Sequence, residues 1–133
     1  MAAVFLGDLR GYIDKTGKVV IEPKFGSASE FHEGLADVVI PFRGQTYIDK
    51  NGNRPIKMIF ADAEEFSEGM PAVRKKKKGK FAYIDKKGKY VIQPQFDGAW
   101  PFKEGVAGVW VDTKFGYIDK TGRFIWGPVE YKY

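Results

Sequence analysis

The sequence predicts an all-β protein built from tandem repeats. The tripeptide Tyr-Ile-Asp occurs four times, beginning at residues 12, 47, 83 and 117, and a glycine follows each tyrosine five residues later. Short runs rich in valine, isoleucine and aromatic residues flank each copy, and such residues favour strands. The spacings of 35, 36 and 34 residues indicate a repeat of about 35 residues.

Each repeat is predicted to form a three-stranded antiparallel meander. In the second repeat, residues 38–40 and 47–48 favour the first two strands, and residues 41–45 between them supply turn residues. All length variation between repeats falls in this link, which indicates an exposed hairpin tip. The next turn has the pattern Asp-x-x-Gly, as in residues 14–17, where the aspartate accepts backbone amide bonds and the glycine adopts positive φ.

The rest of each repeat is predicted to hold a third strand and an exit segment. Residues 19–21 favour the third strand of the first repeat. In the exit segment, Ala28 and Phe31 lie three apart, which predicts one short helical turn closed by the glycine of a Glu-Gly pair. Pro55 replaces a valine in the third strand of the second repeat, which predicts a free side or a bulge there.

The whole chain is predicted to be a single repeat domain of four units, 1–34, 35–69, 70–105 and 106–133. Each unit is too small to bury its own apolar face, so neighbours must share a core. An open array is favoured over a closed, propeller-like ring, because three strands are few for a propeller blade. The altered tail of the last unit indicates a capping unit or the truncation of a longer array. The recurring aromatic residues expected in the core are Tyr12, Tyr47, Tyr83, Tyr117, Phe25, Phe60, Phe96, Phe31, Phe66 and Phe102.

Composition narrows the classes of function. The chain has 22 Lys and Arg against 17 Asp and Glu, a net charge of +5, and no cysteine, which excludes disulfides and thiolate ligands. Its one histidine, His32, falls at a position that varies between repeats, and its carboxylates recur in turns. We therefore expect no catalytic residue, no metal site and no cofactor. No signal peptide or membrane span is evident, which predicts a cytoplasmic protein if the chain is complete.

The most unusual local feature is a basic run at the tip of the longest valine-to-tyrosine link, in the third unit. Such a tip can contact phosphates or acidic surfaces, or it can be a solvated tip whose lysines keep strand edges from pairing. Aromatic residues outside the repeat pattern, including Phe42, Tyr90, Tyr131 and Tyr133, are candidates for exposed contacts or for core and edge cover. The binding residues predicted on these grounds are Arg74, Lys75, Lys76, Lys77, Lys78, Lys80, Trp100 and Trp110.

The repeat resembles the WG repeat, also called the KWG repeat. The resemblance rests on Gly-Tyr-Ile-Asp-Lys-Thr-Gly-Lys-Val-Val-Ile-Glu-Pro-Lys-Phe at residues 11–25, and on the Ala-x-x-Phe-x-Glu-Gly pattern that follows. It covers essentially the whole chain. The chain departs from the family at the Trp-Gly dipeptide itself, to which Phe115-Gly116 comes closest. The resemblance implies a mostly bacterial, strand-rich protein with a binding or scaffolding role and no known catalytic residues.

Two functions of different class follow from these observations. The first is a non-enzymatic module for protein interaction or scaffolding, whose partner is another protein or other domains of a longer parent chain. The alternative is binding of a polyanion or glycan through the basic tip and exposed aromatic residues. A steep loss of binding with salt separates the alternative from the first. The sequence does not indicate an oligomeric state.

Overall fold

The protein folds into small antiparallel β-sheets, described by a computed structural model over residues 1–130, which contain no helix. The first sheet contains β1 (Ala2–Leu6), β2 (Leu9–Ile13) and β3 (Val19–Phe25). The second contains β4 (Ser27–Ala28), β5 (Ala36–Ile40) and β6 (Gly44–Ile48). The third contains β7 (Asp62–Ala63), β8 (Ala72–Arg74), β9 (Phe81–Ile84) and β10 (Tyr90–Phe96). The fourth contains β11 (Gly98–Ala99), β12 (Ala107–Val111), β13 (Lys114–Ile118) and β14 (Phe124–Glu130).

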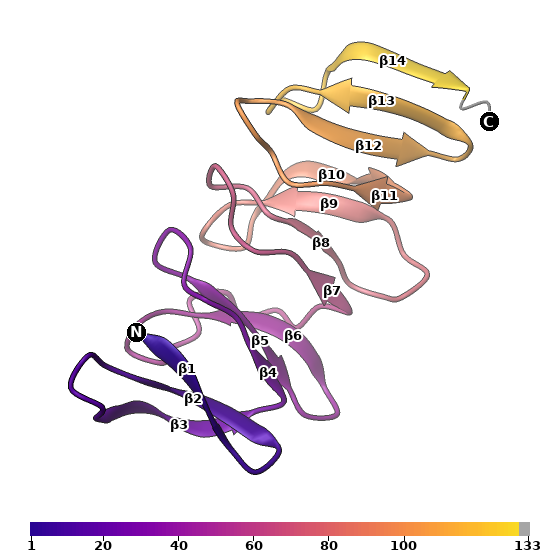
Figure 1. Ribbon diagram of the computed structural model, residues 1–133. Coiled ribbons are helices and arrows are strands. Elements are labelled where there is room, and N and C mark those ends of the chain that lie inside the picture. Colours follow the sequence, from indigo (N-terminus) through magenta and orange to yellow (C-terminus); the bar gives the residue numbers. More distant parts are fainter. Residues whose placement is uncertain (131–133) are drawn as a thin grey trace.

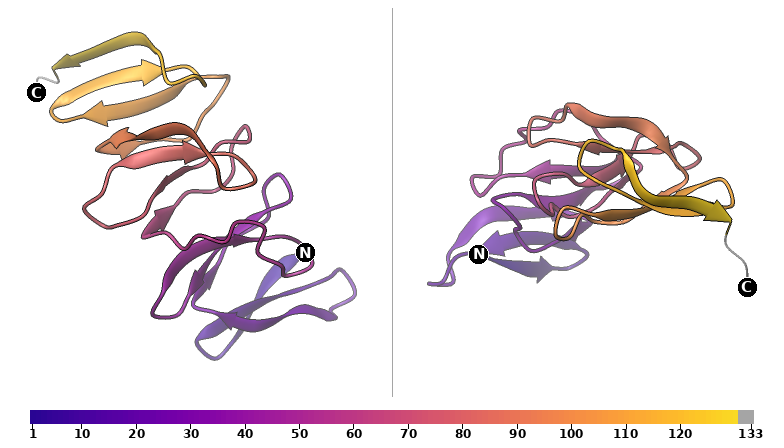
Figure 2. Two further views of the ribbon diagram at one scale, coloured as in Figure 1. Left: turned by 180° about the vertical axis from the view of Figure 1, so that it is seen from behind. Right: turned by 90° about the horizontal axis from the view of Figure 1, so that it is seen from above.

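The sheets stack in chain order into an open, twisted array (Figure 1). Figure 2 shows the same order from behind and from above, with the first and last sheets at opposite ends. Neighbouring strands along the chain pair antiparallel, as β1 with β2 and β12 with β13. This arrangement confirms the predicted array of tandem meanders. The alternative of a closed ring is wrong, because the first and last sheets do not meet.

Each core lies between two successive sheets. Between the first and second sheets, Tyr12, Ile21 and Phe25 pack against Ala36, Val38 and Ile48. The third and fourth sheets repeat the arrangement, with Tyr83, Ile92 and Phe96 facing Ala107, Val109 and Ile118. One face of a sheet therefore supplies a tyrosine, and the opposite face of the next sheet supplies small and β-branched residues.

The tyrosine hydroxyl is bonded wherever a following sheet covers it. Tyr12 donates to the Ser29 carbonyl oxygen at 2.6 Å, and Tyr83 donates to the Trp100 carbonyl oxygen at 2.7 Å. Tyr47 donates in the same way to Glu64. Burial raises the pKa of Tyr12 to about 12, because the charged phenolate is poorly solvated there. The prediction that the repeat tyrosines are core residues is confirmed for these three.

The Asp-x-x-Gly turns have the predicted chemistry. The Asp14 carboxylate accepts bonds from the Thr16 amide at 2.8 Å and the Lys18 amide at 3.1 Å, and Gly17 has a φ of 86°. The hydroxyl and amide of Thr16 hold the pKa of Asp14 below its usual range, because they stabilise the carboxylate. The recurrence of an aspartate at the start of each of these turns is therefore explained by the backbone amides that its carboxylate binds.

The predicted helical turn in the exit segment is wrong. Ser27–Ala28 forms β4 and pairs with β5, the next strand of the second sheet. The Glu-Gly pair is a tight turn with positive φ at both residues, 55° at Glu33 and 85° at Gly34. Bonds between the backbones of His32 and Leu35 close it. The three-residue spacing of alanine and phenylalanine was mistaken for a helical period, because the exit segment is a short strand followed by a hairpin turn.

The second sheet lacks the third strand expected after its Asp-x-x-Gly turn. Residues 49–59, which include Pro55, contain no strand. The Thr46 hydroxyl, fully buried, bonds instead to the carbonyl oxygens of Met58 at 2.9 Å and Ile56 at 3.3 Å. The prediction of a strand with a free side or a bulge at Pro55 is therefore wrong, because this segment forms no strand.

Candidate functional site

The predicted basic tip is the loop between β8 and β9. Arg74 ends β8, and Lys75, Lys76, Lys77 and Lys78 are exposed in the loop. This places the run at a hairpin tip, as its sequence predicted. The cations do not all remain free for a ligand, because acidic side chains of neighbouring segments lie beside some of them.

Two aspartates neutralise much of this tip. The Asp62 carboxylate bonds to Arg74 Nε at 2.5 Å and to Lys77 Nζ at 3.1 Å. These bonds hold the pKa of Asp62 below its usual range, although burial opposes the shift. Asp97 pairs with Lys80. Within residues 1–130, no ion pair forms at Lys75, Lys76 or Lys78, so these three are the available cations of the tip.

The two predicted tryptophans lie on the fourth sheet, apart from the basic loop. Trp110 is in β12, and Trp100 follows β11 with 48% of its surface exposed. Asp97 connects the two regions, because its carboxylate pairs with Lys80 and its amide donates to the Trp110 carbonyl oxygen at 2.8 Å. The structure therefore separates the predicted site residues into a basic loop and an aromatic surface.

The aromatic surface is larger than the sequence predicted. The Phe115 ring lies edge-on to Trp100 at 5.9 Å, to Trp110 at 5.1 Å and to Tyr117 at 5.1 Å, measured between ring centroids. Tyr117 continues the row to Trp126 at 5.9 Å. We call Trp100, Trp110, Phe115, Tyr117 and Trp126 the aromatic face.

The aromatic face occupies the free side of the last sheet. Tyr117 is 41% exposed, whereas Tyr12, Tyr47 and Tyr83 at the same repeat position are fully buried. Trp126 is 53% exposed and stands where Ile92 is buried in the third sheet. The prediction that Tyr117 is a core residue is wrong, because no sheet within residues 1–130 follows to cover it. The described residues of the last sheet do not form the polar outer face that is typical of a capping unit.

Of the other aromatic residues expected at exposed positions, Phe42 is fully exposed, with a φ of 65° at a hairpin tip. Tyr90 is half-buried and lies beneath Lys75, whose Nζ is 5.8 Å from the ring centroid. Tyr131 and Tyr133 lie outside the described residues. Phe115 and Trp126 were not predicted as site residues. Trp126 replaces the isoleucine of the other three repeats, which was a readable signal, whereas Phe115 has an aromatic counterpart in Phe81 and so does not stand out.

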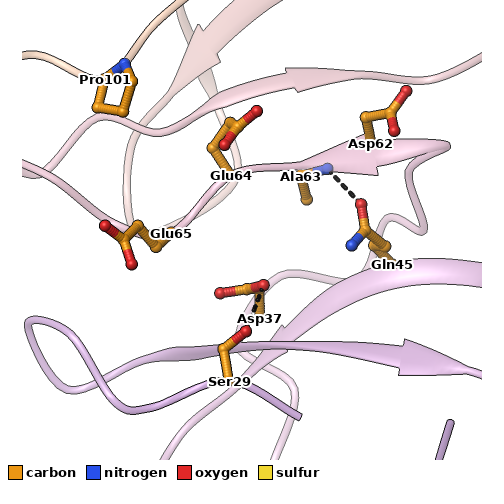
Figure 3. A pocket seen from close by; sticks show the side chains of 8 residues that line it. All are labelled: Ser29, Asp37, Gln45, Asp62, Ala63, Glu64, Glu65 and Pro101. Carbon is orange, nitrogen blue, oxygen red and sulfur yellow. Dashed lines mark hydrogen bonds between the residues drawn. The ribbon is translucent and has the colours of Figure 1, made fainter. Parts of the chain in front are cut away.

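An acidic cleft of about 380 Å³ lies between the second and third sheets (Figure 3). Its carboxylates come from Asp37 on β5 and from Asp62, Glu64 and Glu65 in and after β7. Burial raises the pKa of Asp37 and of Glu64, and neighbouring carboxylates raise that of Glu64 further. Within residues 1–130, no group of acidic or histidine side chains converges closely enough to hold a metal ion.

The acidic cleft and the aromatic face are built at equivalent positions of the repeat. Ser29, Asp37 and Gln45 line the cleft, and Trp100, Gly108 and Phe115 replace them on the fourth sheet. Gly108 makes room for the rings, because a Cβ there would lie 3.0 Å from Phe115 Cζ. The same backbone frame thus presents polar groups inside the array and aromatic rings at its end.

Comparison with known families identifies the repeat. A model described as "WG containing repeat" matches residues 11–40, 46–78 and 81–112, which together make up more than half of the chain. The chain therefore belongs to the WG repeat family, as the resemblance implied. No curated protein matches the chain. Within residues 1–130, no helix has the length and apolar character required to cross a membrane.

Proposed function

We propose that this protein is a non-enzymatic interaction module whose docking surface is the aromatic face. The observation that carries the proposal is the continuous row of five rings on one sheet side, with Trp100, Tyr117 and Trp126 between 41% and 53% exposed. A contiguous apolar patch on a soluble domain marks an interaction site. Tryptophan and tyrosine are also the residues that dominate binding energy at protein interfaces.

The remaining surfaces support this choice over catalysis. The turn aspartates hold backbone amides, as at Asp14. In the acidic cleft, the Ser29 hydroxyl donates to Asp37 at 2.8 Å and His32 Nε2 lies 3.1 Å from Glu65, but within residues 1–130 no hydrogen bond joins the serine to the histidine. A catalytic site requires a nucleophile, a base and a stabilising group in mutual reach. Binding through a rigid row of rings requires only the geometry already described.

A polyanion is the second candidate ligand, because Lys75, Lys76 and Lys78 are exposed without ion-pair partners within residues 1–130. Lys75 and Lys76 line a hollow of about 230 Å³ together with Gly79, Tyr90 and other residues of the third sheet. Lys77 and Lys80 are engaged by aspartates, so the tip offers fewer free charges than its sequence implied. Such binding falls steeply with salt.

A capture experiment from a lysate of the source organism distinguishes the two candidates. The baits are the natural chain, Trp126→Ser, a variant with residues 75–78 changed to Ser, and Phe42→Ser. Phe42 is the matched control, because it is a fully exposed aromatic residue away from the aromatic face. The proposal predicts a discrete protein that is lost only with Trp126→Ser and retained at moderate salt. Nucleic acid or polysaccharide lost with the lysine variant and with salt would favour the polyanion and contradict the proposal.

A further inference from the structure

The two ends of the stack carry the two halves of the interface that recurs inside it. In each interior core, a face bearing tyrosine and isoleucine meets a face bearing valine and isoleucine, as Tyr12 and Ile21 meet Val38 and Ile48. Ala36 belongs to the second kind of face in the first core, and Ala107 takes its place in the third. Tyr83 and Ile92 meet Ala107, Val109 and Ile118 in the same way. The interface is therefore directional, because the face presented by one sheet differs from the face it packs against.

The last sheet exposes the first kind of face. Tyr117 and Trp126 occupy the repeat positions of Tyr83 and Ile92, but they are 41% and 53% exposed. The first sheet exposes the second kind. Ala2, Val4 and Ile13 occupy the positions of Ala36, Val38 and Ile48, and they are exposed or half-buried.

Residues around the first-sheet face extend its apolar surface. Val4 lies opposite Gly11, and the next pair on the same side is Leu6 with Leu9. Leu6 is 71% exposed and Leu9 is 38% exposed. The two end faces are thus both apolar and of complementary type.

Along one side of the stack, lysine side chains in the turns of one sheet bond to glutamate carbonyl oxygens in the turns of the preceding sheet. At the two ends of the stack, one such lysine and one such glutamate have no neighbouring sheet within the described residues. Lys86 Nζ in the third sheet donates to the Glu33 carbonyl oxygen at 2.7 Å, and Lys120 Nζ in the fourth donates to that of Glu68 at 3.0 Å. Glu104 is the next acceptor in this series. The next donor, in a sheet stacked on the fourth, is Lys15 of a second copy.

The turn glycines form a second series with the same direction. A Cβ at Gly122 would lie 3.2 Å from Ile92 of the preceding sheet, and one at Gly52 would lie 3.5 Å from Ile21. Gly17 of the first sheet has open space instead, with nothing within 4 Å of a Cβ. In a second copy stacked on the fourth sheet, Gly17 is the glycine that continues this series, and it would face Trp126.

We propose that the occupant of the aromatic face is the first sheet of a second copy, so that the chain associates head to tail. The proposal rests on the proposed function, since it names the partner of the same surface. Three observations support the proposal: the two end faces are apolar and complementary, Lys15 and Glu104 are unmatched members of the lysine–glutamate series within residues 1–130, and Gly17 is the unmatched member of the glycine series. Because such an interface is heterologous and does not close, it generates chains of increasing length.

Sedimentation velocity over a range of protein concentrations tests the head-to-tail association. Two variants are used, and each of them carries a lysine in one of the two end faces. Trp126→Lys alters the last sheet and Val4→Lys alters the first. We expect the natural chain to show an average mass that rises continuously with concentration. Each variant alone remains monomeric, and an equimolar mixture of the two forms a heterodimer, because each retains the face that the other has lost. Leu6→Lys and Val129→Lys, at exposed positions, replace any variant whose circular dichroism differs from that of the natural chain.

Lys15→Ala provides a finer check, with Lys18→Ala as the control in the same turn. We expect Lys15→Ala to weaken association about two- to fivefold and Lys18→Ala to leave it unchanged. A natural chain that stays monomeric at every concentration overturns the head-to-tail inference. So does association of the variants without complementation on mixing. If the chain is monomeric while capture of another protein still requires Trp126, the inference fails and the proposed function stands.

Discussion

Replacing Tyr83 and Tyr117 by phenylalanine separates a covered tyrosine from an uncovered one at the same repeat position. Tyr83 is fully buried, and its hydroxyl donates to the Trp100 carbonyl oxygen at 2.7 Å. Tyr83→Phe keeps the ring, including its edge contact with Phe102 at 4.8 Å between centroids, and removes only the hydroxyl. Losing this bond and leaving the carbonyl unsatisfied costs about 1–3 kcal/mol of stability.

Tyr117→Phe is the matched substitution. Tyr117 is 41% exposed, and water replaces whatever bond its hydroxyl makes. We expect a change in the free energy of unfolding within about 0.5 kcal/mol. Urea unfolding followed by circular dichroism measures both variants. With a slope of about 2 kcal/mol per molar urea, Tyr83→Phe lowers the midpoint by roughly 0.5–1.5 M. Equal shifts for the two variants, or none for Tyr83→Phe, would refute the stacking of the fourth sheet on the third.

Three further predictions concern other parts of the array. Thr46→Val removes the bond to the Met58 carbonyl oxygen (2.9 Å) and lowers the free energy of unfolding by about 1–3 kcal/mol in urea titrations. The pKa of Tyr12 is raised to about 12 in the folded protein, whereas it is about 10 in the unfolded chain. The contribution of this tyrosine to the free energy of unfolding is therefore complete below about pH 10 and declines towards pH 12. The melting temperature of Tyr12→Phe should therefore fall less over that range than that of the natural chain. The bonds from Thr16 lower the pKa of Asp14 in the folded protein. The Asp14 carboxylate therefore stabilises the fold above the usual carboxyl pKa, and this stabilisation is lost in acid. Asp14→Asn should therefore lower the melting temperature at neutral pH but not near pH 2.

The sequence was sufficient to predict the strands and turns, because both depend on local chemistry repeated in register. The Tyr-Ile-Asp copies with their following glycines place β2, β6, β9 and β13 and the turns after them. The exit segments were misassigned for a physical reason. Ser27–Ala28 is held as a strand by pairing with Val38 and Val39 of the same sheet, ten or more residues further along the chain, and this pairing leaves no local signal.

The candidate site was predicted only in part. Trp100 and Trp110 stand out in the sequence because they depart from the repeat, whereas Tyr117 follows the same pattern as the buried tyrosines. Exposure of Tyr117 follows from its place in the last sheet of the stack, which the tripeptide alone does not encode. Likewise, the pairing of Arg74 with Asp62 joins residues that lie opposite each other on β8 and β7, and it depends on the register of these strands.

Site-specific photocrosslinking tests the central claim, that the aromatic face is a docking surface, most directly. A photoreactive phenylalanine analogue is introduced in place of Trp126, and in a separate chain in place of Phe42. Both positions are exposed and aromatic, and they differ in whether they belong to the aromatic face. The account predicts protein crosslinks from position 126, including peptides of the first sheet of a second copy, and none from position 42. Crosslinks from position 42 with none from position 126 would contradict it.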